Sequence, residues 1–302
     1  MAPARYVTAM SLTVAAFYRF LSLRDLPDLK QDLLAFCRDR ALRGTILIAP
    51  EGVNGTVAGS PDAIEALVAE LHRRFALPCE EVKFSAAPDW PFARMKVRIR
   101  PEIITMRAPE ADPGVAVGTY VEARDWNAVI ADPEVLVLDT RNVYETKVGT
   151  FERAVDPGIE SFTELKGFVA DRLDPGKHRK VAMFCTGGIR CEKASAFMLA
   201  AGFETVYHLK GGILKYLEEV PADESRWQGD CYVFDGRVAV GHGLAPTAWS
   251  ACYGCGAPLS PDDRAAPDYE EGVACPYCAG TLTEEKAAAL RERQRQMSLA
   301  IS

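Results

Sequence analysis

The chain has 302 residues, of which 48% are hydrophobic and 25% are charged, a balance typical of a globular protein with two or three domains. No apolar run approaches the roughly 20 residues of a membrane-spanning helix, so no membrane partner is expected. The formal net charge of −7 argues against nonspecific nucleic-acid binding, but residues 1–118 carry 15 Lys and Arg against 14 Asp and Glu, which leaves room for a locally basic face.

The first 106 residues are expected to form a ferredoxin-like domain. Residues 7–17 are mildly apolar and favour a first β-strand over a signal peptide. Periodic apolar residues predict two helices, at residues 29–40 and from the N-cap Ser60 with Pro61 to residue 75. Strands are predicted at residues 14–20, 45–49, 55–58 and 94–100. The resulting order, βαββαβ, is that of a ferredoxin-like fold.

Basic and apolar residues alternate along the last of these strands. The basic side chains, which would share one face, are Arg94, Lys96, Arg98 and Arg100. Their apolar neighbours Met95, Val97 and Ile99 would face a hydrophobic core. The exposed face would then carry a basic stripe suited to RNA phosphates, or it would simply be a solvated strand face. Both interpretations stay open.

Residues 107–118 contain Pro109, Pro113 and Gly114 and are interpreted as a linker. An α/β domain with a parallel sheet is expected over residues 119–222, because apolar strands alternate there with helices. The strands are predicted at residues 135–138, 181–184 and 205–209. A helix over residues 190–201 should end before Gly202. His208 is interpreted as a core histidine rather than a catalytic base.

The strongest catalytic signal is the segment Cys185-Thr-Gly-Gly-Ile-Arg190, in which a cysteine ends a strand and a glycine loop leads into a helix. Backbone N–H groups, the helix N-terminus and Arg190 should lower the pKa of this thiol. The alternative is a buried structural cysteine. In cysteine phosphatases the arginine lies six positions after the cysteine, whereas here it lies five after. The shorter loop favours a sulfur-sized group, such as a persulfide, on Cys185.

Other residues are assigned to the same site, because ligands of open α/β sheets bind at the carboxyl ends of the strands. Asp139 and Arg141 end an earlier strand and either orient the loop or form an ordinary ion pair. Glu145 has the same two interpretations. Cys191 lies one turn into the helix and is either a resolving thiol for oxidised Cys185 or a helix-packing cysteine.

The loop and the Asp139-Thr-Arg141 strand end resemble the rhodanese family. A narrower resemblance, to the rhodanese-related tRNA uridine hydroxylases (the TrhO family), extends in the same order from about residue 14 to about residue 244. The segments that carry it are Ala49-Pro-Glu-Gly-Val-Asn-Gly-Thr56, Asp139-Thr-Arg-Asn-Val-Tyr-Glu145, Gly149-Thr-Phe151, Phe184-Cys-Thr-Gly-Gly-Ile-Arg-Cys-Glu-Lys193, Gly211-Gly-Ile-Leu-Lys-Tyr-Leu217 and Cys231-Tyr-Val-Phe-Asp235.

The resemblance implies an oxidoreductase that hydroxylates the wobble uridine of tRNA to 5-hydroxyuridine. It implies Cys185 as the active residue, tRNA as the partner and molecular oxygen as the co-substrate. It also strengthens the RNA interpretation of the basic stripe. No motif for an organic cofactor is evident in the sequence.

The C-terminal segment, residues 223–302, contains two CxxC pairs and then a charged, helix-like tail. The pairs are Cys252 with Cys255 and Cys275 with Cys278, with 19 residues between them. Four thiolates in two such turns favour a closed structural zinc site, with unmetallated or redox pairs as the alternative. Metal would contribute much of the folding energy of this short segment. Nine cysteines arranged in this way fit reduced thiols, so a cytoplasmic protein is expected.

Three functions therefore compete. The leading hypothesis is a tRNA-modifying enzyme with a persulfide-capable Cys185. The second is a sulfurtransferase that moves sulfane sulfur through a Cys185 persulfide, in which the N-terminal domain and the zinc segment would serve little purpose. The third is a noncatalytic RNA-binding adaptor, which the intact loop from Cys185 to Arg190 argues against. The sequence predicts no oligomeric state.

Overall fold

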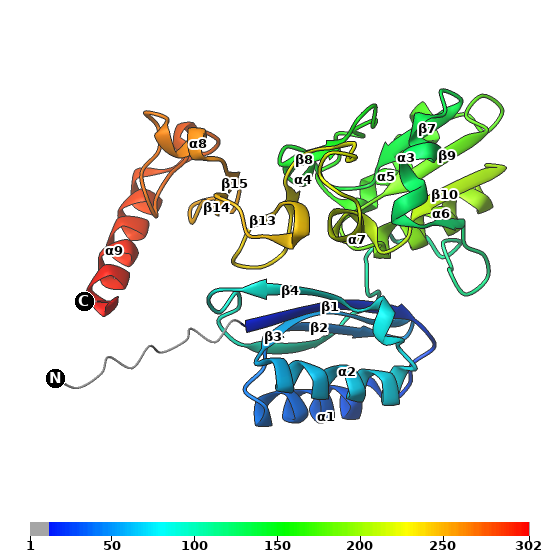
Figure 1. The fold of residues 1–302 in the computed structure, drawn as a ribbon. Coiled ribbons are helices and arrows are strands. Elements are labelled where there is room, and N and C mark those ends of the chain that lie inside the picture. The colour runs from blue at the N-terminus through cyan, green and yellow to red at the C-terminus, as the bar shows by residue number, and fades with distance from the viewer. Residues whose placement is uncertain (1–11, 302) are drawn as a thin grey trace.

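The structure is a computed structural model that describes residues 12–301. The predicted strand residues 7–11 lie outside this range. Figure 1 shows an N-terminal domain below a central α/β domain, with a C-terminal segment beside them. In the described range, no helix combines the length and the apolar character that crossing a membrane requires.

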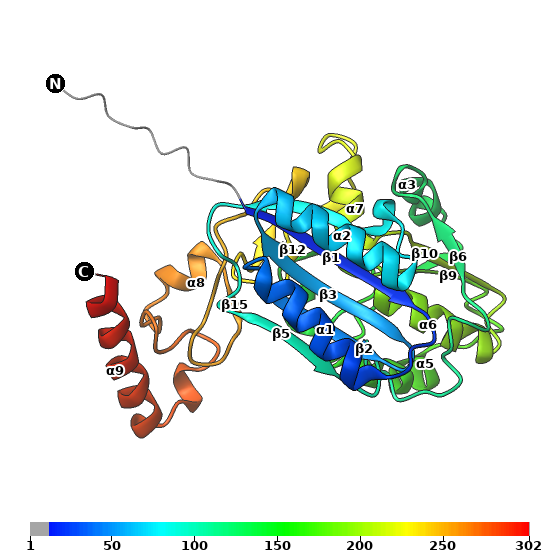
Figure 2. The same ribbon diagram turned by 90° about the horizontal axis from the view of Figure 1, so that it is seen from below.

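The N-terminal domain is a five-stranded sheet with two helices on one face (Figure 2). Its elements are β1 (Leu12–Phe20), α1 (Leu26–Asp39), β2 (Arg43–Ala49), β3 (Gly52–Gly59), α2 (Pro61–Phe75), β4 (Lys83–Ala87) and β5 (Met95–Ile99). The strand order is β4-β1-β3-β2-β5. The first four strands pair antiparallel, as the βαββαβ pattern requires, so the ferredoxin-like fold is confirmed.

The strand that completes the βαββαβ unit differs from the predicted one. It is β4, which the sequence does not predict because Lys83-Phe-Ser-Ala-Ala87 is short and only partly apolar. The predicted strand at residues 94–100 does form, as β5, but it is an additional edge strand that runs parallel to β2. The domain therefore has one more strand than expected, and the basic stripe lies on an edge strand.

The two faces of this sheet differ in chemistry. Alternate residues such as Phe17, Ile46 and Val57 are buried under α1 and α2. Val97 of β5 packs into the same core, as predicted. Ile99 lies at the end of this edge strand and is 40% exposed, so it does not pack into that core. The expectation that Ile99 faces the core is therefore wrong.

The central domain has a four-stranded parallel sheet in the order β6-β10-β9-β7. Its elements are β6 (Thr119–Val121), α3 (Ala123–Ala131), β7 (Val135–Asp139), α4 (Val143–Thr146), β8 (Gly149–Phe151), α5 (Leu165–Arg172), β9 (Lys180–Phe184), α6 (Ile189–Ala200), β10 (Thr205–Leu209) and α7 (Gly212–Glu219). One core lies between the sheet and α3 and α7, and another between the sheet and α5 and α6. The predicted parallel α/β architecture is confirmed.

Two connecting segments pack on this central domain. Ala108 and Ala111, within the predicted linker, are buried against the core of α5 and α6. Downstream, β11 (Trp227–Gly229) pairs with β8, and the hairpin of β12 (Cys231–Tyr232) and β13 (Ala239–Val240) contributes to the core of α3 and α7. The packing thus continues to Leu244 and does not end at residue 222, where the domain boundary was expected. We propose a boundary just beyond Leu244.

The remaining residues form a small separate cluster. They contain β14 (Ser250–Ala251), β15 (Pro258–Leu259), α8 (Pro261–Ala265) and α9 (Glu284–Ile301). The predicted helical tail is confirmed as α9, which projects from this segment in Figure 1. Its core is small: three cysteines, Cys252, Cys275 and Cys278, are buried there with Leu259, Val273, Ala274 and Ala287.

Candidate active site between two domains and a candidate metal centre

The cysteine loop has the geometry that its sequence predicts. β9 ends at Phe184, Cys185 follows, and α6 begins at Ile189. Gly188 has φ 101°, a conformation that favours glycine, and its N–H donates to Cys185 Sγ over 3.2 Å. Gly212 lets α7 approach the loop, because a Cβ there would lie 2.5 Å from the Cys185 carbonyl oxygen. The thiol is therefore held at a strand end against backbone donors.

Arg190 does not act as an isolated positive charge. Its Nη1 and Nη2 donate to Glu145 Oε1 and Oε2 over 2.5 and 2.7 Å. Thr186 Oγ1 donates to the same carboxylate over 3.2 Å. Burial opposes both charges, but their mutual attraction lowers the pKa of Glu145 and raises that of Arg190. The pair ties the loop to α4.

Charge and hydrogen-bond donors around Cys185 favour its thiolate form. Burial raises the pKa of its thiol, but the Cys191 side chain, Arg190 and the backbone N–H groups of Cys191 and Gly188 together lower it well below its ordinary value. Burial and the Cys185 charge raise the pKa of Cys191. Cys191 Sγ also lies 3.4 Å from Thr140 Oγ1. These two directions favour a thiolate at Cys185 and a protonated thiol at Cys191.

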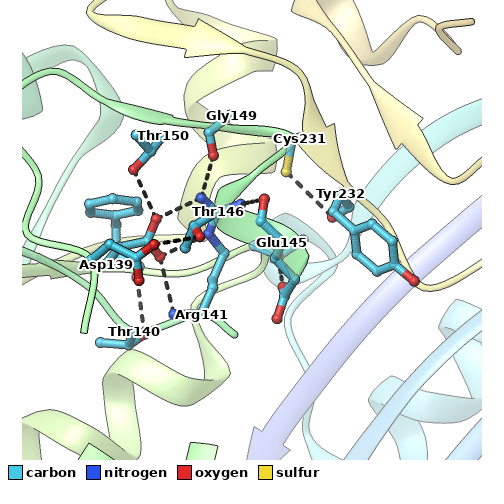
Figure 3. Close-up of polar contacts among 12 residues, drawn as sticks. Asp139, Thr140, Arg141, Glu145, Thr146, Gly149, Thr150, Cys231 and Tyr232 are labelled. Carbon is cyan, nitrogen blue, oxygen red and sulfur yellow. Dashed lines mark hydrogen bonds and ion pairs between the residues drawn. The ribbon is translucent and has the colours of Figure 1, made fainter. Parts of the chain in front are cut away.

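Asp139 and Arg141 form a separate buried network, drawn in Figure 3. The guanidinium of Arg141 donates to Asp139 Oδ1 and Oδ2 over 2.9 and 2.6 Å, to Gly149 O over 2.6 Å and to Glu145 O over 3.3 Å. Thr150 Oγ1 donates to Asp139 Oδ2 over 2.9 Å. These contacts fix the main chain at Glu145, whose side chain holds Arg190.

The N-terminal sheet covers this loop with the face that its own helices leave open. Tyr18 OH of β1 donates to Glu192 Oε2 of α6 over 2.8 Å, and the Lys83 ammonium lies 4.9 Å from the Tyr18 ring centroid. Lys193 Nζ donates to Glu51 Oε2 over 2.9 Å and also contacts Glu102. These bonds join the two domains around the thiol.

Between the domains lies a cavity of about 460 Å³. Residues that line it include Tyr18, Lys83, Arg100, Cys185, Arg190 and Phe234. Burial lowers the pKa of Lys83 to about 8, although the charge of Cys185 opposes this shift. The cavity thus combines a thiolate with basic side chains, a set suited to an electron-poor, anionic ligand.

The predicted basic stripe lies on the face of the N-terminal sheet that lines the cavity. Lys96 and Arg98 pair in register with Thr45 and Leu47, which line the cavity, so their side chains leave the same face. Within residues 12–301, no ion pair or side-chain hydrogen bond involves any of the four basic residues. The stripe therefore leads from the cavity toward solvent as uncompensated positive charge.

The side chains of the four C-terminal cysteines form one cluster. The sulfur atoms of Cys252, Cys255, Cys275 and Cys278 all lie within 4.8 Å of one another. Three of the sulfur–sulfur distances are 3.7 to 3.8 Å. A tetrahedral ion with sulfur ligands at about 2.3 Å requires a sulfur–sulfur distance of about 3.8 Å. The site can therefore hold a metal ion such as zinc, as the spacing predicts.

Sequence patterns do not identify several residues of the site. Tyr18 and Lys83 line the cavity beside Cys185 only through packing between distant segments, and no local pattern marks them. Phe234 lies in the segment Cys231-Tyr-Val-Phe-Asp235 that carries the family resemblance, but that segment alone assigns it no role. Glu145 has a weak signal, because it stands three residues after Asn142, whose N–H donates to its carboxylate. His208 is a core histidine, as expected: Nε2 lies 3.2 Å from Gly118 O, and burial lowers its pKa to about 4.

Comparisons with known proteins match most of the chain. Residues 12–103 match the family described as UPF0176 acylphosphatase like domain, and residues 122–219 match the rhodanese-like domain. A protein of Teredinibacter turnerae and one of Mesorhizobium japonicum, both called tRNA uridine(34) hydroxylase, are each 52% identical over 95% of this chain, covering 89% and 93% of their own lengths. The rhodanese-like domain of an Anabaena protein is 20% identical, covers 36% of this chain and 78% of its own, and has a TM-score of 0.30.

Proposed function

This chain belongs to the family of the tRNA uridine(34) hydroxylases, and on this premise we propose that it hydroxylates the wobble uridine of tRNA to 5-hydroxyuridine. One observation supports this most directly. The Cys185 loop, whose hydrogen bonds favour a thiolate, lies in a cavity that the basic face of a second domain also lines. A nucleophile and phosphate-binding side chains are thus brought together, as a nucleic-acid-modifying enzyme requires.

Five residues in and around the Cys185 loop have proposed roles. Cys185 is the reactive group, and Arg190 holds its loop in position through the ion pair with Glu145. Asp139 and Arg141 act as positioning residues, because their network fixes the main chain of Glu145, the partner of Arg190. Cys191 is a resolving thiol for oxidised Cys185, because it is buried in the first turn of α6, directly after the Cys185 loop.

The tRNA contacts the N-terminal sheet through Arg94, Lys96, Arg98 and Arg100. Phosphate contacts of this kind orient the substrate without reading its sequence. A protein that acts on tRNA would work in the cytoplasm. One atom of molecular oxygen, the co-substrate that the family resemblance implies, would enter the C5–H bond of uracil to give the hydroxyl group. The other atom would leave as water, with two electrons and two protons supplied by an external reductant. Zinc at the four C-terminal cysteines would stabilise that segment, because a four-thiolate site leaves no open position for chemistry.

The test is nucleoside mass spectrometry of tRNA from a strain that lacks the gene. Wild-type protein should restore 5-hydroxyuridine, and growth under labelled oxygen should place the label in it. Cys185→Ser should not restore the modification, whereas Cys79→Ser, which changes an exposed cysteine that does not line the cavity, should. If wild-type protein transferred sulfane sulfur from thiosulfate to a small thiol and left tRNA unmodified, the sulfurtransferase alternative would replace this proposal.

A further inference from the structure

A short hairpin presents one aromatic ring to the cavity. β12 and β13 are joined by a turn in which Val233 N–H donates to Val238 O over 2.8 Å. Cys231 and Val233 point into the core of the central domain. Tyr232 and Phe234 lie together on the other side, with their ring centroids 5.2 Å apart, and Phe234 lines the cavity.

The tip of this hairpin is attached to the N-terminal domain. Arg237 pairs with Asp235 over 2.6 Å, and its Nη1 donates to Ser85 Oγ of β4 over 2.6 Å. Gly236 N–H donates to Pro91 O over 2.9 Å. The turn that carries Phe234 is therefore held from both domains before any ligand arrives.

The Phe234 ring lies close to the reactive loop yet remains open. Its centroid is 5.8 Å from Arg190 Cζ, and Tyr232 meets it edge to face at 5.2 Å. The residue is nevertheless 56% exposed. The ring has no polar atom, so what it offers a ligand is a flat apolar surface beside a thiolate and cations.

We infer that Phe234 is the surface on which the target uracil stacks when it enters the cavity, an inference that rests on the proposed function. A cavity of about 460 Å³ is in the range that accommodates a single small ligand. One base must therefore leave the stack of the anticodon loop to reach Cys185, as in other enzymes that modify a base. Stacking on an aromatic side chain compensates for the stacking that the base loses.

The test is a double-mutant cycle in which the Phe234 ring and the base at position 34 of the RNA are removed separately and together, and binding affinity is measured each time. Two anticodon stem-loop RNAs are compared, one with uridine at position 34 and one with an abasic residue there. Affinities are measured by fluorescence anisotropy with oxygen excluded. Removing the base should weaken binding to wild-type protein about tenfold or more. Removing it should change binding to Phe234→Ala less than about twofold, because the stacking partner is already gone.

Matched variants keep the test sharp. Phe84→Ala removes the same side chain from β4, where Phe84 is 36% exposed and does not line the cavity, and it should behave like wild type. Phe234→Tyr should keep the full dependence on the base. If Phe234→Ala unfolds, Phe234→Leu removes the ring but keeps apolar volume, and it should lose most of that dependence.

The result that overturns the inference is an equal loss of affinity on base removal in wild type and in the Phe234 variants. Hydroxylation by wild-type protein would persist in that case, so the proposed function would stand without the stacking role. If wild-type protein instead failed to hydroxylate tRNA, the proposed function itself would fail. The two failures are read from different measurements.

Discussion

Arg190 and Glu145 form a bidentate ion pair beside Cys185, with side chains that are 6% and 0% exposed. Glu145 cancels part of the arginine's charge at the sulfur. The Cys191 thiol and the backbone N–H groups of Cys191 and Gly188 lower the pKa of Cys185 as well, so its thiolate does not depend on the arginine alone. The ion pair instead sets the position of the loop, and the donors around the sulfur set its charge.

Cys185 should titrate well below neutral pH. Its folded-state pKa is below that of the unfolded chain, so the thiolate stabilises the fold above the unfolded pKa. This contribution is lost as pH falls through the folded pKa. Cys191→Ala removes one of the groups that lower the pKa of Cys185, so the titration of Cys185 should move to higher pH. The measurement is the ultraviolet absorbance of the thiolate against pH, which needs no reagent to reach the buried sulfur.

Cys231→Ala is the control for this titration. Burial raises the pKa of Cys231 to about 12, so it carries no charge near neutral pH, and its removal should leave the curve unchanged. An unchanged curve in Cys191→Ala would show that Cys191 packs in the helix without supporting the thiolate. It would then also lose its proposed role as a resolving thiol.

The Arg190–Glu145 pair should show strong coupling in stability. Arg190→Gln and Glu145→Gln each leave one buried charge without a partner, and each should lower the free energy of unfolding by about 3–5 kcal/mol. The double variant should lose much less than the sum, because no unpaired charge remains. Urea unfolding of the wild type and three variants measures this. Losses that simply add would mean that the two charges act independently.

The sequence predicts those parts of the site that lie within one continuous segment. Cys185 to Arg190 and the four C-terminal cysteines are recognisable because chemistry constrains their spacing. The strands at residues 135–138, 181–184 and 205–209 are recognisable because they are apolar on both faces. Lys83 and Phe234 are different, since each reaches the cavity only when two domains pack. β4 is missed because a short, half-polar edge strand has little pattern of its own.

Metal should support only the C-terminal segment. Purified protein is expected to contain about one zinc per chain, as a single four-cysteine site requires. Chelation should unfold the cluster around Leu259 and Val273, because its core is small, and leave the central domain intact. Elemental analysis and hydrogen exchange of the two regions check this.

Two substitutions test whether zinc binding depends on the cysteines of the cluster or on any cysteine of the chain. Cys275→Ser should lose the zinc, while Cys79→Ser, at an exposed position outside the cluster, should keep it. A metal-free protein in which residues 250–290 remain protected from exchange would contradict the structural role.

The basic stripe should contribute to tRNA affinity in a salt-dependent way. Lys96 and Arg98 lie on the sheet face that lines the cavity, so Lys96→Ala combined with Arg98→Ala removes two phosphate contacts. Each contact with single-stranded RNA contributes about −0.7 to the slope of log affinity against log salt, so the slope should flatten by roughly 1.4. Binding of different tRNAs should weaken about equally, since phosphate contacts carry no sequence information.

Arg38→Ala combined with Arg40→Ala is the matched control for this double variant. It removes the same charge from the same domain, but at exposed positions on and just after α1, which packs on the opposite face of the sheet. If the stripe contacts RNA, only the first double variant should change the slope, and neither should alter the titration of Cys185. Equal slopes in wild type and both variants would mean that Arg94 to Arg100 is a solvated strand edge. A small, equal flattening in both variants would instead indicate that only the overall charge of the domain attracts tRNA, without a defined contact.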